Sequence, residues 1–238
     1  MNAELITIAV MTVDRQPCYL HQTLASMFMA ERRLHDLPVV RLVAGTNTLG
    51  YLDNYAHHER IAVHPLGDFE QQVISSWSLP RRHCHNYWRC LSLPVADGGG
   101  ICICEDDVIF RDNFVSHLVK TVDQVQEAGI RDYGLALSTC YDFEAEGRCG
   151  TGRSYCAYDD PFYGTQAMYY PAQTAAELRE YLYECGVQRY TKPSDILVRD
   201  RYADRIYACT PSLVDHIGVT STGLGCTGRS PSFYRPMR

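Results

Sequence analysis

The stretch 101-ICICEDDVIFRDNF-114 limits the possible folds more than any other part of the chain. Its first four residues (101–104) are apolar and lead directly into three consecutive carboxylates, Glu105, Asp106 and Asp107, after which apolar residues resume at once. An uninterrupted apolar run of this kind is typical of a buried strand in an α/β protein. Ligands of such proteins gather at the carboxyl ends of the strands. The carboxylates therefore form either a solvated turn or a ligand site, and the immediate return of apolar residues favours the site.

Strand and helix patterns alternate along the whole chain, and we find no internal repeat, low-complexity tract or linker. This alternation predicts one α/β domain over residues 1–238, with a mixed, mainly parallel sheet flanked by helices. Asp112 is the expected N-cap of one helix. The expected strands are 5–13, 39–44, 61–65, 101–105, 133–139, 165–170 and 206–213, and the expected helices are 19–28, 70–93 with an interruption at Pro80, 113–127, 174–185 and 194–202.

Composition and charge narrow the class of protein. A net charge of −6 over 238 residues argues against a protein that coats nucleic acid, because backbone binding depends on clustered positive charge. The apolar start, 5–13, is too short to span a bilayer and lacks a basic n-region and a cleavage site. We therefore expect no membrane span and a cytoplasmic location. Eleven cysteines without a secretory signal are interpreted as reduced thiols.

Adjacent carboxylates repel one another, and a cation relieves that repulsion. A hard divalent ion, Mn²⁺ or Mg²⁺, is the expected ligand of Glu105, Asp106 and Asp107, with substrate phosphates completing its coordination shell. Phosphoryl chemistry also uses such clusters, so a metal-dependent phosphoesterase or nuclease is an alternative function. The acidic balance of the chain counts against the nuclease.

Three motifs carry a resemblance to a known family. They are the acidic triplet 105–107, the segment 211-PSLVDHIG-218 followed by Thr220 and Ser221, and the opening 9-AVMTVDRQPCYLHQTLASM-27. Together they resemble glycosyltransferases of the GT-A fold, in which an acidic DxD motif ends a central strand and binds the metal of a nucleotide-sugar. Within that fold the chain is most similar to the inverting N-acetylglucosaminyltransferase IV family and related bacterial and phage proteins. The resemblance covers nearly the whole chain in element order.

The resemblance implies a GT-A (Rossmann-like) domain with a nucleotide-binding half, 1–110, and an acceptor-side half, 111–238. It implies that Asp107, the last residue of the triplet, binds the metal directly. His216 is then a second metal ligand or a diphosphate contact, and the alternative is a histidine satisfied within the core. Polar residues on both sides of His216 favour the ligand.

The resemblance also implies a donor pocket built from three parts of the chain. Glu105 and Asp106 would lie near the ribose or reach the metal through water. Basic residues of helix 81–89 would face the diphosphate, with the remainder solvated, whereas the His-Cys-His run 83–85 is a weak zinc signal without a second ligand pair. Arg15 is equally compatible with a surface charge. The expected donor contacts are Thr12, Asp14, Arg15, Arg82, Asn86, Glu105 and Asp106.

An inverting sugar transfer is a single displacement, in which a carboxylate takes the proton of the acceptor hydroxyl. In related enzymes this base lies between the acceptor-side strand and the strand of the C-terminal histidine. The resemblance therefore points to Asp195, within 192-KPSDILVRDRY-202. An Asp just after a proline is also an ordinary N-cap, and Asp159 and Asp160 are the reserve candidates for the base.

Two further segments leave alternatives open. The stretch 141–164 is rich in aromatic residues and glycine, so it either folds over the donor as a lid that excludes water or packs down on the core. The tail 223–238, with Arg229, Arg235 and Arg238, is either a disordered end or a second phosphate clamp.

Taken together, these features predict an inverting, metal-dependent glycosyltransferase that transfers a hexosyl or N-acetylhexosaminyl group from a nucleotide-diphosphate sugar, a UDP-sugar being favoured. A nucleotide-sugar-binding module without catalysis is a further alternative. The acceptor is open among a glycan, a lipid-linked saccharide, a protein and a modified nucleic-acid base.

Overall fold

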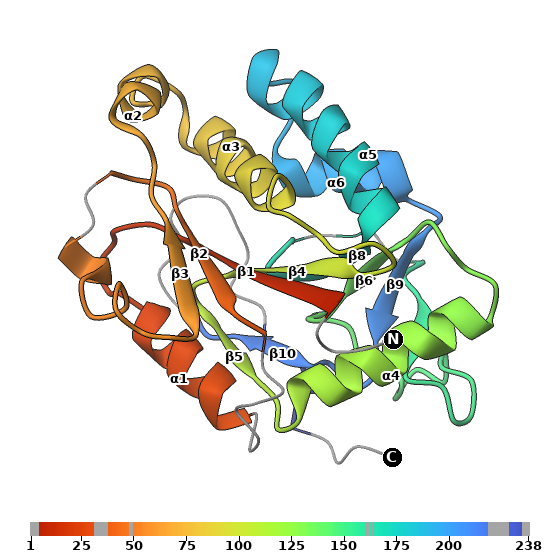
Figure 1. Ribbon diagram of the computed structural model, residues 1–238. Helices are drawn as coiled ribbons and strands as arrows, with labels where there is room; N and C mark the ends of the chain where they lie inside the picture. The colour runs from red at the N-terminus through yellow and green to blue at the C-terminus, as the bar shows by residue number, and fades with distance from the viewer. Residues whose placement is uncertain are drawn as a thin grey trace.

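The computed structural model describes residues 5–30, 38–47, 50–159, 162, 164–218 and 229–234 (Figure 1). Across these residues the centre of the molecule is an eight-stranded mixed sheet. Its strands, in spatial order, are β3 (Ile61–His64), β2 (Val40–Ala44), β1 (Ile6–Thr12), β4 (Gly100–Glu105), β8 (Ala167–Pro171), β6 (Gly134–Ala136), β9 (Ile206–Cys209) and β7 (Tyr155–Ala157).

Neighbouring strands from β3 to β4 are parallel, β8 runs against β4 and β6, β9 is parallel to β6, and β7 is antiparallel to β9. β4 is therefore a central strand, and its five residues before Glu105 are all buried. The first residue of this strand, Gly100, has no room for a side chain, because a Cβ there would overlap the ring of Tyr169 on β8.

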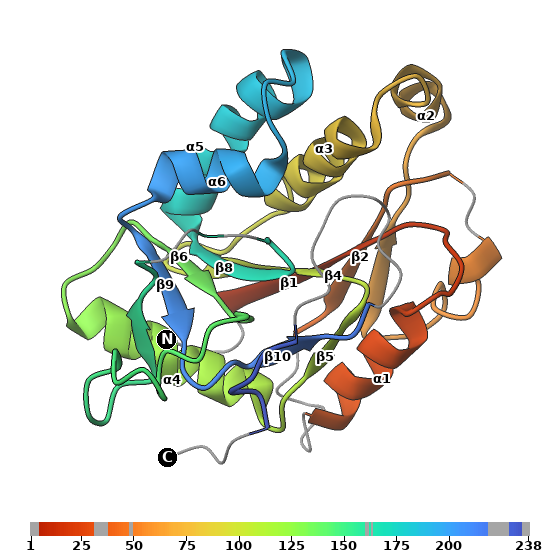
Figure 2. The same cartoon turned by 180° about the vertical axis from the view of Figure 1, so that it is seen from behind.

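Helices cover both faces of the sheet (Figures 1 and 2). α1 (Leu20–Ala30) and α4 (Phe114–Glu127) pack on one face, while α3 (Leu79–Leu91), α5 (Ala172–Leu182) and α6 (Ser194–Tyr202) pack on the other. β1 shows why two layers form: Ile6, Ile8 and Val10 belong to the first core, whereas Ala9 and Met11 belong to the second. Alternate side chains of a strand point to opposite faces, so an all-apolar strand needs a helix layer on each side.

Several boundaries differ from the sequence prediction. The helix expected over 70–93 is two helices, α2 (Asp68–Ile74) and α3, and Pro80 lies in the first turn of α3 rather than interrupting a helix. Proline is well tolerated there because the first turn has no N–H partners to lose. The N-cap of α4 is Asn113, not Asp112, and its left-handed backbone (φ 55°) is one that asparagine adopts more readily than most residues.

The late strand predicted over 206–213 is also divided. β9 ends at Cys209, and a separate strand, β10 (Val214–His216), pairs antiparallel with β5 (Val108–Phe110). This two-stranded ribbon starts immediately after the acidic triplet, so it places His216 opposite Val108. The pairing is what brings the C-terminal histidine to the tip of β4.

The stretch 141–164 contains β7, which the sequence did not predict, and its aromatic residues pack inward. Phe143, Tyr158 and Phe162 are buried, with edge-to-face contacts between Tyr158 and the other two rings. These three rings therefore pack on the core. Asp160, Tyr163, Thr220, Ser221, Arg235 and Arg238 lie outside the described residues.

The structure also bears on the expected membrane span and on the state of the cysteines. In the described ranges no helix is long and apolar enough to cross a membrane. Ten cysteines within the same ranges are free thiols. The division into halves at 110 and 111 stays a prediction, and strands from both ranges share the main sheet.

Candidate functional site

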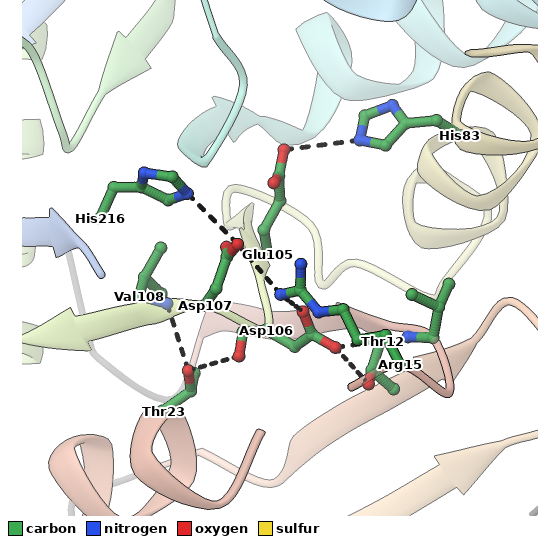
Figure 3. A network of polar contacts seen from close by, with 10 residues as sticks. Thr12, Arg15, Thr23, His83, Glu105, Asp106, Asp107, Val108 and His216 are labelled. Atoms are coloured by element: carbon green, nitrogen blue, oxygen red, sulfur yellow. Dashed lines mark hydrogen bonds and ion pairs between the residues drawn. The ribbon is translucent and has the colours of Figure 1, made fainter. Parts of the chain in front are cut away.

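The candidate site lies where β4 ends, at the carboxyl edge of the parallel strands (Figure 3). Glu105 is the last residue of β4 and pairs in register with Met11 of β1, so the end of β1 lies beside the acidic turn. Asp106 and Asp107 form the turn that connects β4 to β5. The three carboxylates contact different elements of the fold, and Arg15 is shared by Asp106 and Asp107.

The Asp106 carboxylate is turned inward and is held by the end of β1. Thr12 Oγ1 donates to its Oδ2 at 2.6 Å, the Val13 backbone N–H lies 3.3 Å from the same oxygen, and Arg15 bonds Oδ1. Burial raises the pKa of Asp106 to about 6, although Arg15 and Thr12 act in the opposite direction. Three of the predicted donor contacts thus form one buried network with each other.

Thr23, on α1, forms hydrogen bonds to the same turn. Thr23 Oγ1 donates to the Asp106 carbonyl oxygen at 2.7 Å and accepts from the Val108 backbone N–H at 3.2 Å. One hydroxyl therefore bridges the two sides of the acidic turn (Figure 3). Sequence patterns did not single out Thr23, because a threonine on the buried face of a helix carries no signal of the loop it contacts.

Asp107 faces His216 across the β5–β10 ribbon. Its Oδ2 lies 3.2 Å from His216 Nε2 and 3.0 Å from Arg15 Nη2. Gly218 completes the enclosure, because a Cβ there would overlap the Asp107 carboxylate and lie 2.9 Å from His216 Nε2. Asp107 Oδ1 and His216 Nδ1 are buried without a hydrogen-bond partner among the described residues.

The two side chains shift each other's pKa. Burial alone would raise the pKa of Asp107, but the hydrogen bond and charge of His216, with Arg15, outweigh it and lower that pKa. Burial alone would lower the pKa of His216, and the bond to Asp107 raises it instead. In the absence of another cation, His216 therefore favours its charged form beside a charged Asp107.

The donor set fits a divalent cation held jointly with a substrate. Asp107 Oδ2 and His216 Nε2 lie 3.2 Å apart, and the second carboxylate oxygen, Asp107 Oδ1, has no partner among the described residues. Gly218 keeps the space beside Oδ2 and Nε2 clear of a side chain. Mn²⁺ and Mg²⁺ commonly take one or two protein ligands and complete their shells with phosphate oxygens and water. No cluster of three or more His, Cys, Asp or Glu side chains is found among residues the structure describes, so the protein alone offers only part of a shell.

The remaining carboxylate, Glu105, contacts α3 instead. His83 Nε2 lies 3.4 Å from Glu105 Oε1, and His83 Nδ1 lies 2.9 Å from Ser194 Oγ at the start of α6 (Figure 3). The sequence placed His83 in a basic helix but could not show that it touches the triplet.

The polar side chains of α3 that the sequence placed near the donor have different contacts along the helix. Asn86 is buried against the end of β2, where its Nδ2 lies 3.5 Å from the Val43 carbonyl oxygen. Arg89 donates to the carbonyl oxygens of His64 and Pro65 beyond β3. Arg82 is one turn nearer the N-terminus, and its Nε is buried with no hydrogen-bond partner among the described residues. Asn86 therefore supports the end of the sheet, and Arg82 keeps bonding capacity for a ligand.

Asp195 lies in the first turn of α6, directly after Ser194. The N-cap position is Pro193 and no side chain caps this helix, so Asp195 is not the N-cap. Its side chain is half-buried, while Asp14 and Asp159 are exposed. The role of Asp195 as a base stays a prediction.

The described part of the C-terminal tail docks behind β10. Asp215 is fully buried and accepts from Arg229 Nη1 and from the Ser230 backbone N–H, each at 2.7 Å. Arg229 thus bonds a carboxylate of the protein itself, which argues against the phosphate-clamp alternative for this arginine.

Comparison with known proteins supports the fold. No family model matches the chain, and no curated protein matches its sequence. Among solved structures, it is similar to the crystal structure of GalNAc-T7 with UDP, GalNAc and Mn²⁺, with a TM-score of 0.59 and 11% sequence identity. The match covers 93% of this chain and 45% of that one. The chain has a GT-A, Rossmann-like fold. This confirms the predicted fold class, while the narrower resemblance to the N-acetylglucosaminyltransferase IV family stays an expectation.

Proposed function

We propose that the protein is an inverting, metal-dependent glycosyltransferase that uses a nucleotide-diphosphate sugar. One observation carries the proposal: Asp107 and His216, from two segments more than a hundred residues apart, meet at the carboxyl edge of a GT-A sheet, and each has a buried polar atom without a partner among the described residues. Buried polar groups in folded proteins nearly always have partners, so atoms without one indicate a ligand. In an α/β sheet this edge is the usual ligand position.

Asp107 and His216 would hold Mn²⁺ or Mg²⁺ together with the donor diphosphate. A bound divalent cation supplies Lewis-acid stabilisation of the charge that develops on the departing diphosphate. Arg15 already places a fixed positive charge beside Asp107, and Arg82 on α3 has a buried Nε with no partner in the part of the chain that the structure describes. Such preorganised positive groups lower the barrier because they need little reorganisation as charge develops.

The same proposal assigns the base to Asp195. Asp195 lies in the first turn of α6, next to Ser194, and its side chain is half-buried. Asp195 would accept the proton of the acceptor hydroxyl while that oxygen attacks the anomeric carbon, which inverts the configuration there.

A UDP-sugar, with a hexosyl or N-acetylhexosaminyl group, is the donor class we favour. The structurally similar GalNAc-T7 was crystallised with UDP, GalNAc and Mn²⁺, which supports this class. A cytoplasmic location is part of the proposal and is supported by the free thiols, which suit a reducing compartment.

Calorimetry with UDP, in the presence and absence of MnCl₂, tests the metal site. Asp107→Ala should abolish Mn²⁺-stimulated UDP binding while the protein stays folded, whereas Asp97→Ala, an exposed acidic residue in the turn before β4, should bind like the wild type. Full Mn²⁺ stimulation in folded Asp107→Ala would overturn the metal site. Hydrolysis of a panel of nucleotide-sugars then separates an enzyme from a binding module, and Asp195→Asn should lower that turnover by about 10²–10⁴-fold with little change in UDP affinity.

A further inference from the structure

His83 joins three elements at one point. It belongs to α3, its Nε2 lies 3.4 Å from Glu105 at the tip of β4, and its Nδ1 lies 2.9 Å from Ser194 Oγ at the start of α6. Ser194 is buried, and the His83 ring also stacks on the ring of Tyr87, with centroids 6.4 Å apart and planes inclined by 30°. Both ring nitrogens are thus engaged, and the imidazole has a defined orientation.

For a neutral His83 ring, the chemistry of these partners sets the direction of each contact. An ionised carboxylate can only accept, so the proton toward Glu105 belongs to His83 Nε2. In the neutral ring Nδ1 is then the acceptor, and Ser194 Oγ–H donates to it. The result is a directed chain from Ser194 through His83 to Glu105.

Glu105 is the least restrained member of the triplet. Asp106 has three groups on its carboxylate and Asp107 has two, while His83 is the only group recorded on the Glu105 carboxylate within the described ranges. The Glu105 side chain is 27% exposed at the mouth of the site. Its orientation toward a ligand therefore depends on His83.

We propose that His83 is a positioning residue of the donor site: it aims the Glu105 carboxylate at the bound nucleotide and, through Ser194, sets the start of α6 relative to β4. This inference rests on the proposed function, because it takes UDP with a divalent cation as the ligand. Asp195 follows Ser194 directly, so the same chain of bonds ties the donor-side strand to the helix of the predicted base.

A double-mutant cycle tests the link, with UDP and MnCl₂ as the probe. His83→Phe keeps the ring and its packing on Tyr87 but removes both nitrogens, and Glu105→Ala removes the partner. Each should weaken UDP binding by about tenfold, and the double variant should bind no more weakly than either single one, because coupled residues are not additive. His117→Phe, on α4 at the other face of the sheet, is the matched control and should leave affinity unchanged.

Ser194→Ala applies the same test to the contact between Ser194 and His83. It should weaken UDP binding by about threefold in the wild type and have no further effect beside His83→Phe. Effects of His83→Phe and Glu105→Ala that multiply, or a His83→Phe variant that loses melting temperature but not UDP affinity, would overturn the proposal.

NMR of the imidazole nitrogens separates this inference from the proposed function, since it needs no ligand. At a pH where the ring is neutral, His83 should be the Nε2–H tautomer in the wild type and a mixture of tautomers in Glu105→Ala. If His83 shows the Nε2–H tautomer but the protein does not bind UDP, the proposed function is refuted, and with it the role of His83 toward a donor. The contact between His83 and Glu105 would still be established. An Nδ1–H tautomer in the wild type would refute the bond.

Discussion

Removal of the Asp215 carboxylate should destabilise the protein far more than removal of its ionic partner. Asp215 is fully buried, and its Oδ1 accepts from the Ser230 backbone N–H at 2.7 Å, while Arg229 and Tyr234 Oη bond Oδ2. Ser230 is also buried, so in Asp215→Ala its N–H loses its partner where water does not reach it. A buried unsatisfied donor costs about 1–3 kcal/mol, and a lost hydrogen bond to a charged group costs a similar amount.

The expected loss is therefore about 3 kcal/mol of unfolding free energy for Asp215→Ala, or a fall in Tm of about 6–12 °C for a chain of this length. Arg229→Met should cost less than about 1 kcal/mol, because the arginine side chain is 60% exposed and solvent screens the pair. Urea denaturation of both variants at equal m-value measures the difference. Equal destabilisation by the two substitutions would refute the reasoning, since the energy would then reside in the ion pair.

The same variants connect the tail to the site. Asp215 and His216 are neighbours on β10, so their side chains point to opposite faces of the ribbon, one toward the docked tail and one toward Asp107. Loosening of the strand at Asp215 should weaken Mn²⁺-dependent UDP binding without any contact to the ligand. Arg229→Met should leave that affinity unchanged, and a loss there would contradict the assignment.

Three further predictions concern the metal pair. Gly218→Ala should abolish Mn²⁺-stimulated UDP binding, because the new Cβ displaces the ends of the Asp107 and His216 side chains. The protein should stay folded, since no backbone atom is displaced, and unchanged binding by calorimetry contradicts the prediction. The pKa of His216 is raised, so its contribution to stability is fully present below the ordinary value of 6.5 and is lost as pH rises through the raised value. The unfolding free-energy difference between wild type and His216→Gln, measured without metal, should therefore shrink as pH rises above 6.5, and a constant difference refutes this. EDTA should lower UDP affinity in the wild type and leave it unchanged in folded Asp107→Ala, as measured by calorimetry.

Much of the fold was predictable because its signals are local. The apolar run before Glu105 predicted the central strand, and the pattern over 194–202 predicted the bounds of α6. Hydrophobic periodicity acts over a few residues, and packing between the sheet and its two helix layers did not override it. The short ribbon was missed because three residues in each of β5 and β10 carry too little pattern to indicate a strand.

The contacts within the site were less predictable because they join distant segments. The sequence could not show the partners of the three carboxylates: Glu105 contacts His83, Asp106 contacts Thr12, Asp107 contacts His216, and Arg15 joins the last two carboxylates. Asp106 turns inward because the end of β1 offers it two donors and a guanidinium, an arrangement that depends on strand order. His83 meets Glu105 because α3 packs on the face of the sheet that contains β4, a contact that joins two separate elements.

The residues around His216 show that its position beside Asp107 does not follow from the polarity of its sequence neighbours. Polar neighbours were taken to favour a ligand role for the histidine, yet Asp215 points away from the site and Ser212 contacts Ser232 of the tail. What brings His216 to Asp107 is the pairing of β10 with β5, which fixes the alternation of side chains across the ribbon. A one-residue slip of that register would exchange the two faces and leave Asp215 beside Asp107, where two buried carboxylates would repel. The buried bonds of Asp215 to the tail therefore act against that slip, and in doing so they keep the histidine at the site.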